Sequence, residues 1–243
     1  KRYGELVATS LDGNIPEKIP RTDVVIYPGY GPDDLKNNQY RKRILDLLGV
    51  SYIIYARNPM EADEPDKITF PEDRYRFLYN DEQVQIYENK DALPRIFLAG
   101  EVLVEKNPEA IMTKIFDQKV DLRKTVILEE DLPMNLLPEK DPNAQLRLIA
   151  YEPNKIVIQT TASKNQMLFL SDTFFPGWKA MVDEREQQLY RADYAFRAVA
   201  LSPGEHTVVF SYRPESFYWG MIISISTFTF MMIGWFFLRK KLV

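Results

Sequence analysis

The sequence predicts an α+β protein: a small mixed α/β unit, then an antiparallel β-sandwich of the jelly-roll kind, then one C-terminal transmembrane helix. Three observations predict this order. Helical and strand patterns alternate up to about Glu130, short strands follow one another at regular spacing after Gln145, and an uncharged apolar run precedes the C-terminus. We therefore divide the chain into an α/β subdomain (1–140), a sandwich subdomain (141–214) and a transmembrane helix with a short basic tail (215–243).

The first unit begins with a helix that Asp33 or Asp34 can cap and that Gly49 can end. A second short helix opens at Asn107 with Pro108 in its first turn. The acidic, proline-containing stretch Asn58–Asp73 is predicted to be a loop. The strand patterns around these helices are VSYIIY (50–55), QVQIYE (83–88), RIFLAGEVLV (95–104) and TVILEE (125–130).

The polar, turn-forming segment Glu139–Gln145 is the best internal boundary. Pro176-Gly177 and Pro203-Gly204 each fit the centre of a type II turn, which needs a positive φ at its second central residue. Seven strand patterns separated by turns follow the boundary, and this spacing indicates a sandwich. They are QLRLIAY (145–151), KIVIQTT (155–161), QMLFLSD (166–172), WKAMVD (178–183), QQLYRA (187–192), FRAVAL (196–201) and HTVVFSY (206–212).

The run Phe217–Leu238 contains no charged residue. About 22 residues at 1.5 Å each give a helix of roughly 33 Å, which matches a hydrocarbon core of about 30 Å. Trp219 and Trp235 mark aromatic belts at its two ends, and Arg239, Lys240 and Lys241 follow directly. The positive-inside rule then puts the C-terminus in the cytoplasm and the bulk of the chain outside. A buried or interfacial helix is the alternative, but the run has no strongly polar face.

Composition excludes several classes of function. The chain has no cysteine, a single histidine (His206) and a formal net charge of −4. The lack of cysteine excludes thiolate metal sites and disulfides. A single histidine is too few for a histidine-cluster metal site and leaves one possible residue for a conventional Ser/His/Asp triad. Nucleic acid is not an expected partner, because the basic residues are scattered. We expect no cofactor, no metal and no catalytic residue in this part of the chain.

Aromatic residues are the first candidates for ligand contact. Four of them lie in or beside sandwich strands, and flat rings on an exposed sheet face can stack on sugar rings: Trp178, Tyr190, Tyr194 and Phe175. Core packing is the alternative for each of them. The tyrosine-rich loop Ile26–Asp34 is a second possible contact surface. Carboxylates that could serve as an acid–base pair or hold calcium, or could simply form a solvated rim, are Asp172, Asp183, Glu184 and Glu186.

Four stretches together resemble the C-terminal part of the YfhO-like family of bacterial membrane proteins, which is similar to glycosyltransferases of the GT-C type. They are ILDLLGVSYII (44–54), IYENKDALPRIFL (86–98), LSDTFFPGWKAMVD (170–183) and the stretch from Tyr190 to Ser224, which runs into the membrane segment. The family pattern has a glycine after Val-Asp and an asparagine in the following strand, where this chain has Glu184 and Asp193.

The resemblance implies a location in the bacterial cell membrane and a multi-span bundle upstream of Lys1 that would carry the catalytic loop. The expected partners are the lipid bilayer, that bundle, and an envelope glycan or lipid-linked sugar. In this interpretation the sandwich binds or orients a glycan acceptor, and chemistry takes place elsewhere in the protein. Two alternatives remain open: a non-enzymatic membrane-anchored ectodomain that binds carbohydrate or protein, and a hydrolase that uses converging carboxylates.

Overall fold

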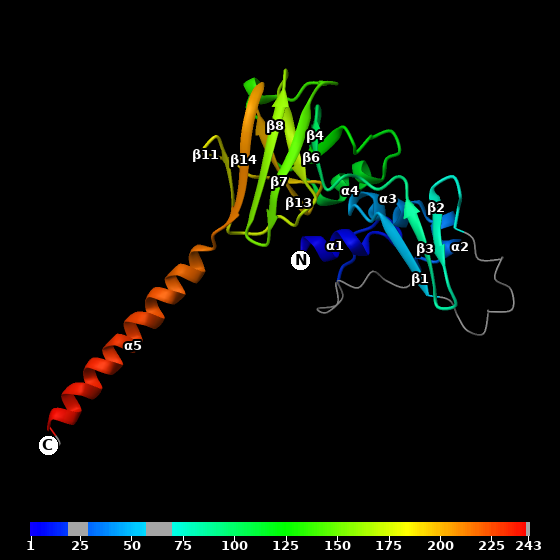
Figure 1. Cartoon of the computed structure of the whole chain (residues 1–243). Coiled ribbons are helices and arrows are strands. Elements are labelled where there is room, and N and C mark those ends of the chain that lie inside the picture. The colour runs from blue at the N-terminus through cyan, green and yellow to red at the C-terminus, as the bar shows by residue number, and fades with distance from the viewer. Residues whose placement is uncertain (19–28, 57–69, 242–243) are drawn as a thin grey trace.

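The structure is a computed structural model that describes residues 1–18, 29–56 and 70–241, without the side chains of Phe236 and residues 238–241. Within these ranges the strands form three sheets. The fold class predicted from the sequence is confirmed: the chain is α+β, with sandwich-like sheets and one apolar C-terminal helix (Figure 1).

The six-stranded sheet is the central layer of the molecule. Its strands run in the order β4, β9, β13, β12, β6, β5, and only the pair β5–β6 is parallel. Their bounds are β4 (Ile96–Ala99), β5 (Glu101–Val104), β6 (Thr125–Leu128), β9 (Gln166–Leu170), β12 (Tyr190–Ala192) and β13 (Phe196–Leu201).

A five-stranded antiparallel sheet, in the order β11, β10, β14, β8, β7, packs on one face of this layer. Between the two sheets lies an apolar core to which Ile158, Leu168, Val199 and Phe210 contribute. The strand bounds are β7 (Gln145–Glu152), β8 (Lys155–Ala162), β10 (Trp178–Val182), β11 (Arg185–Gln187) and β14 (Gly204–Tyr212).

Helices cover the opposite face of the six-stranded sheet. Leu6, Ile44 and Ile111, one from each helix, pack with Phe169 and Ala198 of the sheet. Every residue of β9 and β13 is therefore buried, which explains why these two strands read as continuous apolar runs and not as alternating patterns. The helices are α1 (Arg2–Ala8), α3 (Gln39–Leu47) and α4 (Pro108–Phe116).

A three-stranded antiparallel sheet, in the order β1, β3, β2, forms a smaller unit with its own core. Phe70, Tyr75 and Tyr87 pack there with Leu35 and Leu45. The bounds are α2 (Pro32–Asn37), β1 (Tyr52–Ala56), β2 (Tyr75–Asn80) and β3 (Val84–Asn89). Sequence patterns predicted neither β2 nor the N-terminal helix α1, because these two segments lack the periodicity on which the sequence predictions depend.

The boundary predicted near residue 140 stays a prediction. The six-stranded sheet takes β4, β5 and β6 from before it and β9, β12 and β13 from after it. A short 3₁₀ turn, Met134–Leu136, lies between the two groups of strands. The predicted strand 187–192 is divided: β11 ends at Gln187 in one sheet and β12 begins at Tyr190 in the other.

The final helix α5 (Glu215–Lys241) projects away from the sheets (Figure 1). Its segment Glu215–Trp235 is long and apolar enough to cross a membrane, and none of it is buried against the rest of the chain. Large side chains such as Phe217, Phe228 and Phe230 are mostly exposed along it. A helix that presents apolar residues on all sides needs a lipid or protein environment rather than water.

Candidate functional site

Two hollows among the described residues gather side chains that could bind a ligand. One is a charged cleft of about 480 Å³ between α3, the turn after β3 and the loop after α4. The other is an aromatic pocket of about 410 Å³ at the end of the sandwich from which α5 departs.

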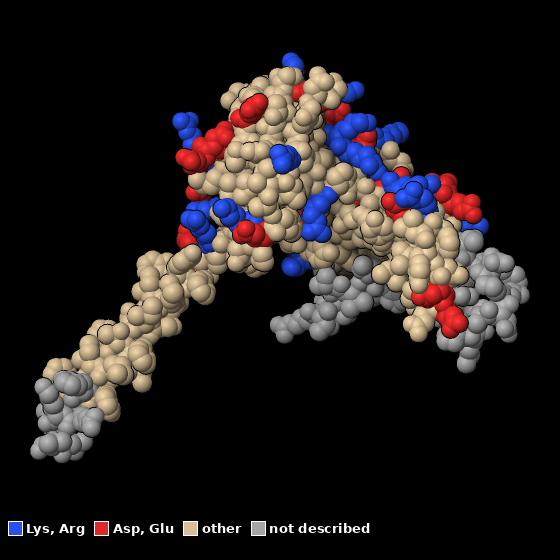
Figure 2. Space-filling view, viewed as in Figure 1, with Lys and Arg blue, Asp and Glu red and all other residues tan. Residues whose placement is uncertain are grey.

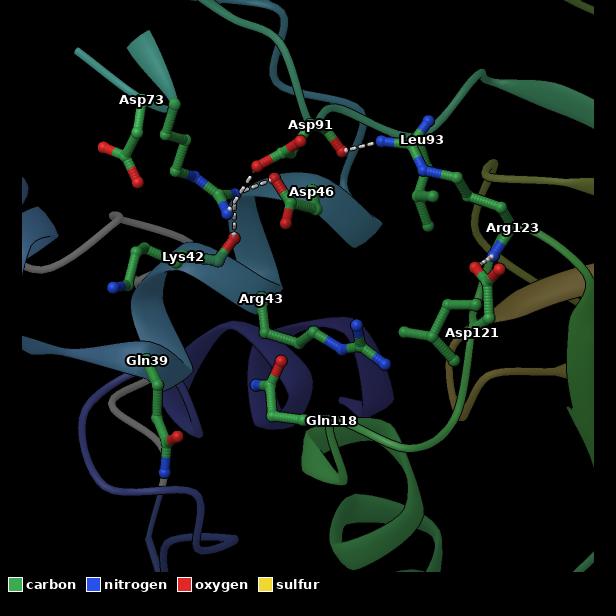
Figure 3. Close-up of a pocket in the computed structure, with 12 residues that line it drawn as sticks. Gln39, Lys42, Arg43, Asp46, Asp73, Asp91, Leu93, Gln118, Asp121 and Arg123 are labelled. Carbon is green, nitrogen blue, oxygen red and sulfur yellow. Dashed lines mark hydrogen bonds and ion pairs between the residues drawn. The ribbon is translucent and has the colours of Figure 1, made fainter. Parts of the chain in front are cut away.

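The charged cleft combines cations and anions in equal number (Figure 3). Its cationic residues are Lys42, Arg43, Arg74 and Arg123, and its anionic residues are Asp46, Asp73, Asp91 and Asp121. Most of the guanidinium groups already have protein partners. Arg43 donates to the carbonyl oxygens of Ile115, at 2.8 Å, and Val120, and so holds the end of α4 and the loop behind it.

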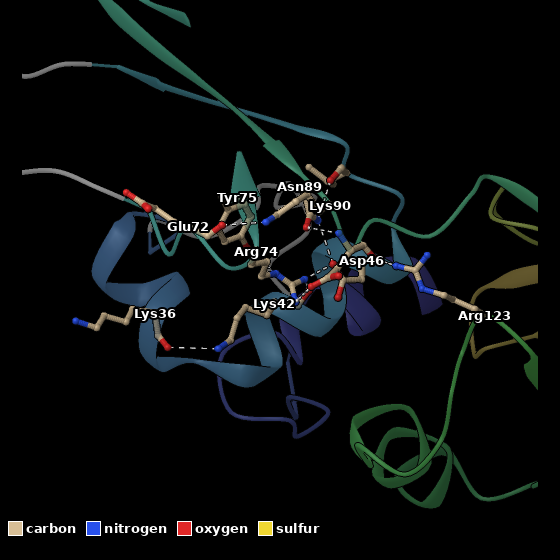
Figure 4. A network of polar contacts seen from close by, with 11 residues as sticks. Lys36, Lys42, Asp46, Glu72, Arg74, Tyr75, Asn89, Lys90 and Arg123 are labelled. Atoms are coloured by element: carbon tan, nitrogen blue, oxygen red, sulfur yellow. Dashed lines mark hydrogen bonds and ion pairs between the residues drawn. The ribbon is translucent and has the colours of Figure 1, made fainter. Parts of the chain in front are cut away.

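A polar network joins the small three-stranded unit to α3 (Figure 4). Arg74 pairs with Asp46 and, at 3.1 Å, with Asp91, while the side-chain amide of Asn89 donates to Asp46 at 3.0 Å. Burial raises the pKa of the Asp46 carboxyl. The hydrogen bonds from Arg74 and Asn89 lower it by less, so the pKa stays above its ordinary value. For Arg74, burial lowers the pKa, but the hydrogen bond and charge of Asp46 together with Tyr75 outweigh this effect, so that the pKa is raised. Since these charges satisfy one another, the cleft is chiefly a joint between structural units.

The aromatic pocket lies at one end of the sandwich, where β10, β13, β14 and the loops after β7 and β9 bring its residues together. Trp178 starts β10 and stands opposite Tyr212, the last residue of β14, with ring centroids 5.5 Å apart. Phe175, in the preceding loop, lies 6.4 Å from Tyr212 and is 56% exposed. Polar side chains complete the wall: Asn154, Asp172, Thr173 and Arg197.

Arg197 is the central cation of this pocket. Its side chain is 1% exposed, its Nη2 donates to Asp172 Oδ2 at 3.0 Å, and its guanidinium carbon lies 3.7 Å from the centroid of the Trp178 ring. Nε and Nη1 of Arg197 are buried and have no hydrogen-bond partner among the described residues. Burial lowers the pKa of Arg197, which Asp172 opposes. A stacked and paired guanidinium fixes the ring of Trp178 in place.

Asp172 connects the buried Arg197 to polar side chains at the surface. Both of its carboxylate oxygens accept from the Tyr151 hydroxyl at 2.9 Å, and Arg95 donates to the same hydroxyl oxygen at 2.7 Å. Burial and Asp172 raise the pKa of Tyr151, so that the hydroxyl stays protonated. The pocket thus offers an aromatic wall beside planar polar groups that can donate and accept, which is the usual composition of a small-ligand site.

Two side-chain contacts join Ser202, His206 and Asp183 in the order found in serine hydrolases. Ser202 Oγ lies 3.2 Å from His206 Nε2, and His206 Nδ1 lies 2.6 Å from Asp183 Oδ2. However, Nε2 is also 3.0 Å from the Ser202 carbonyl oxygen, to which it can only donate, so it is not free to accept a proton from the serine. The histidine lowers the pKa of Asp183, whose other oxygen accepts from Thr207 N at 2.8 Å. We therefore assign this chain of contacts to closing the turns at that end of the sheet.

The sequence-predicted contact residues have different surroundings. Tyr190 and Tyr194 are 3% and 2% exposed and pack in the core between the six-stranded sheet and the helices. Of the predicted aromatic residues, Trp178 and Phe175 line the pocket and can contact a ligand. The hydroxyl of Tyr194 donates to Glu5 Oε2 at 2.7 Å, and burial raises its pKa. The tyrosine-rich loop lies partly outside the described residues, at positions 26–28.

The predicted membrane anchors lie along α5. Trp219 and Trp235 are 64% and 56% exposed. Arg239, Lys240 and Lys241 continue the helix, but their side chains lie outside the described residues. In the ranges that the structure describes, no group of three or more histidine, aspartate or glutamate side chains is arranged to hold a metal ion.

Sequence reasoning did not single out Arg197 or Tyr212. The signal that could have found Arg197 is a cation within the otherwise apolar strand FRAVAL, because a buried arginine requires partners.

Part of the chain is similar to a known family of proteins. Residues 118–224 match the family model described as "Bacterial membrane protein YfhO". This part of the chain is similar to the YfhO-like family of bacterial membrane proteins. The protein named "Uncharacterized protein YfhO" from Bacillus subtilis (strain 168) is 24% identical over 124 residues, which cover 50% of this chain and 14% of that protein. No solved structure matches.

The part that matches the YfhO family contains all of the five-stranded sheet, four strands of the six-stranded sheet (β6, β9, β12 and β13) and the first residues of α5. All residues that line the aromatic pocket fall inside it, whereas most of those that line the charged cleft lie before it. The aromatic pocket is therefore the better candidate for a function that belongs to the YfhO-like region.

Proposed function

We propose that this chain is the extracytoplasmic C-terminal region of a multi-span bacterial membrane protein that resembles lipid-linked-sugar-dependent glycosyltransferases of the cell envelope. In this proposal the aromatic pocket binds a glycan acceptor close to the bilayer, and the catalytic groups belong to another part of the protein. The observation that carries it is the position of Trp178 and Arg197 beside the residues that lead into α5.

The chemistry of the pocket fits a sugar ring. One face of a pyranose is lined with C–H groups that pack against an aromatic ring, while its hydroxyls pair with planar polar groups. Trp178 supplies the ring, and Asn154, Asp172 and Thr173 supply donors and acceptors around it. Because Arg197 and Asp172 hold one another, the pocket is preorganised and loses little entropy on binding.

Holding the acceptor near the bilayer also has a kinetic reason. A lipid-linked donor is confined to the membrane surface, so a tethered domain that binds the acceptor raises its local concentration there. No catalytic group is needed in the sandwich for this effect.

The test is binding of the full chain, reconstituted in lipid nanodiscs, to an array of bacterial envelope glycans. We expect Trp178→Ala to weaken binding roughly tenfold or more, because loss of a central aromatic contact costs about 1.4–2 kcal/mol or more. Phe77→Ala is the matched control, since Phe77 is also an exposed aromatic (54%) but belongs to the three-stranded unit. Absence of binding to every glycan, or equal binding by both variants, would contradict the proposal.

A further inference from the structure

The loop before β10 is fastened to the joint between the sandwich and α5. Arg213 N donates to the Gly177 carbonyl oxygen at 2.7 Å, and Tyr212 N donates to the Asn154 carbonyl oxygen at 2.9 Å. Gly177 has φ +102°, and a Cβ there would lie 3.1 Å from the Cα of Pro214, which shows how closely loop and joint pack. Two loops of the sandwich therefore hold the chain where it leaves β14.

The joint is also very short. Only Arg213 and Pro214 separate the end of β14 from the start of α5. Three Cα–Cα steps from Tyr212 to Glu215 span at most about 11 Å. When α5 crosses a bilayer from its first apolar turn onward, this end of the sandwich must therefore lie at or within the headgroup layer, which is about 5–7 Å thick on each side.

The surface at this end has the residues that such a layer favours. Phe175 is 56% exposed at the tip of the loop, next to exposed Pro176, and Trp178 and Tyr212 stand behind it. Aromatic side chains continue on the first turns of α5, where Phe217, Tyr218 and Trp219 are 65%, 47% and 64% exposed. Charged side chains gather around the same junction (Figure 2). Aromatic rings flanked by charges are characteristic of the membrane–water interface.

We propose that the loop Thr173–Gly177, with Phe175 at its tip, docks into the lipid headgroup layer of the membrane that α5 spans. The partner that contacts this apolar loop tip is lipid, because the surface of the tip is continuous with the exposed aromatic residues on the first turns of α5. This second contact fixes the tilt of the sandwich and sets the aromatic pocket at the level of the headgroups. The inference concerns orientation and does not depend on glycan binding.

The absence of cysteine in the chain allows a direct test by site-directed spin labelling. Single variants Phe175→Cys, Tyr218→Cys and Met134→Cys of the full chain would be labelled in nanodiscs made of phosphatidylglycerol and phosphatidylethanolamine. The measurement is the accessibility of each nitroxide to apolar oxygen relative to a water-soluble nickel chelate. Met134 is the aqueous reference, because it is 84% exposed and the loop containing Asn135 and Leu137 packs against Asn165, at the end of the sandwich opposite Tyr212.

We expect the oxygen-to-nickel ratio at position 175 to approach that at position 218 and to be several-fold higher than at position 134. Pro176→Cys provides a second label in the same loop in case the first substitution disturbs it. Ratios at 175 and 176 equal to the ratio at 134 would overturn the inference.

Discussion

A single buried cation, Arg197, holds the walls of the aromatic pocket together. Arg197 arises from β13, where all its neighbours are apolar, and it is held by Asp172 and the ring of Trp178. Without Asp172 the guanidinium would be buried unpaired, which would cost several kcal/mol. Residue by residue, the pocket is therefore one unit whose members cannot be exchanged independently.

Asp193 is the most perturbed carboxyl group described. Burial raises its pKa to about 7, although a bond from Ile127 N at 2.8 Å and the charge of Arg43 lower it. Its second oxygen is buried without a hydrogen-bond partner among the described residues. The folded pKa exceeds the unfolded value of about 3.9, so the folded state binds the proton more tightly. The contribution of this group to stability is complete below about pH 4 and is lost as the pH rises through 7.

We predict that Asp193→Asn removes this loss, because the amide oxygen can still accept from Ile127 N and no charge forms. The wild-type chain should lose up to about 4 kcal/mol of unfolding free energy between pH 4 and pH 8 through this group, and the variant should not. Thermal unfolding of both proteins at pH 5 and pH 8 measures the difference. Identical pH dependence in the two proteins would contradict the assignment.

At the scale of elements, tight turns decide where the sandwich strands end. β10 and β11 are joined by Asp183 and Glu184, both with positive φ (48° and 67°), as a two-residue type I′ hairpin requires. Asparagine and glycine are the preferred residues there, so Glu184 holds a strained conformation. This is the position where the resemblance to the YfhO-like family places a glycine, and the turn shows why glycine fits.

Glu184→Gly should therefore raise the free energy of unfolding by about 1 kcal/mol, because glycine adopts a positive φ without a steric penalty. Chemical denaturation of the full chain in detergent gives the value. Glu186→Gly, two residues later in β11, is the control and should destabilise, since a strand residue gains nothing from glycine and the pair with Lys179 at 3.3 Å is lost. A destabilised Glu184→Gly would show that the glutamate makes a contact that outweighs the strain.

At the scale of the whole molecule, three packed layers are connected to one membrane helix, α5. The helices α1, α3 and α4, the six-stranded sheet and the five-stranded sheet share two apolar cores, and α5 leaves from the outer sheet. Basic residues follow the apolar run of α5 in the sequence, and by the positive-inside rule they support the proposed extracytoplasmic location of the layers.

This orientation predicts that a membrane-impermeant maleimide labels Met134→Cys in intact cells as strongly as in lysed cells. Met134 is suitable because it is 84% exposed and no other cysteine competes. The cysteine-free wild-type protein controls for background labelling. Labelling that requires lysis would place the sandwich in the cytoplasm and would remove the basis for the envelope-glycan proposal.

Local patterns predicted most of the elements. The membrane helix follows from an uncharged run, and each of the seven predicted sandwich strands overlaps an observed strand, because alternation or a bounded apolar run is a local property. Predictions were incomplete where the pattern is weak or divided. The sequence did not predict α1 and β2, and the one helix predicted up to Gly49 is divided at Asn38 into α2 and α3. The predicted strand 187–192 passes from one sheet to the other between Gln187 and Tyr190.

The candidate site was only partly predictable. Trp178 was identified as a possible contact residue, but Tyr190 and Tyr194 have the same local character and are buried, since the helices cover that face of the six-stranded sheet. Which face of a strand is covered depends on distant segments.

The sequence alone therefore determined the class of the elements, their order, the membrane helix and the absence of thiol and histidine-cluster chemistry, because these follow from composition and from neighbours along the chain. Only the tertiary structure decided that strands from both sides of residue 140 share one sheet and that Trp178, Arg197, Asp172 and Tyr212 meet beside α5. The physical reason is that strand pairing and burial are contacts between residues far apart in the chain, and a local pattern does not encode its partner.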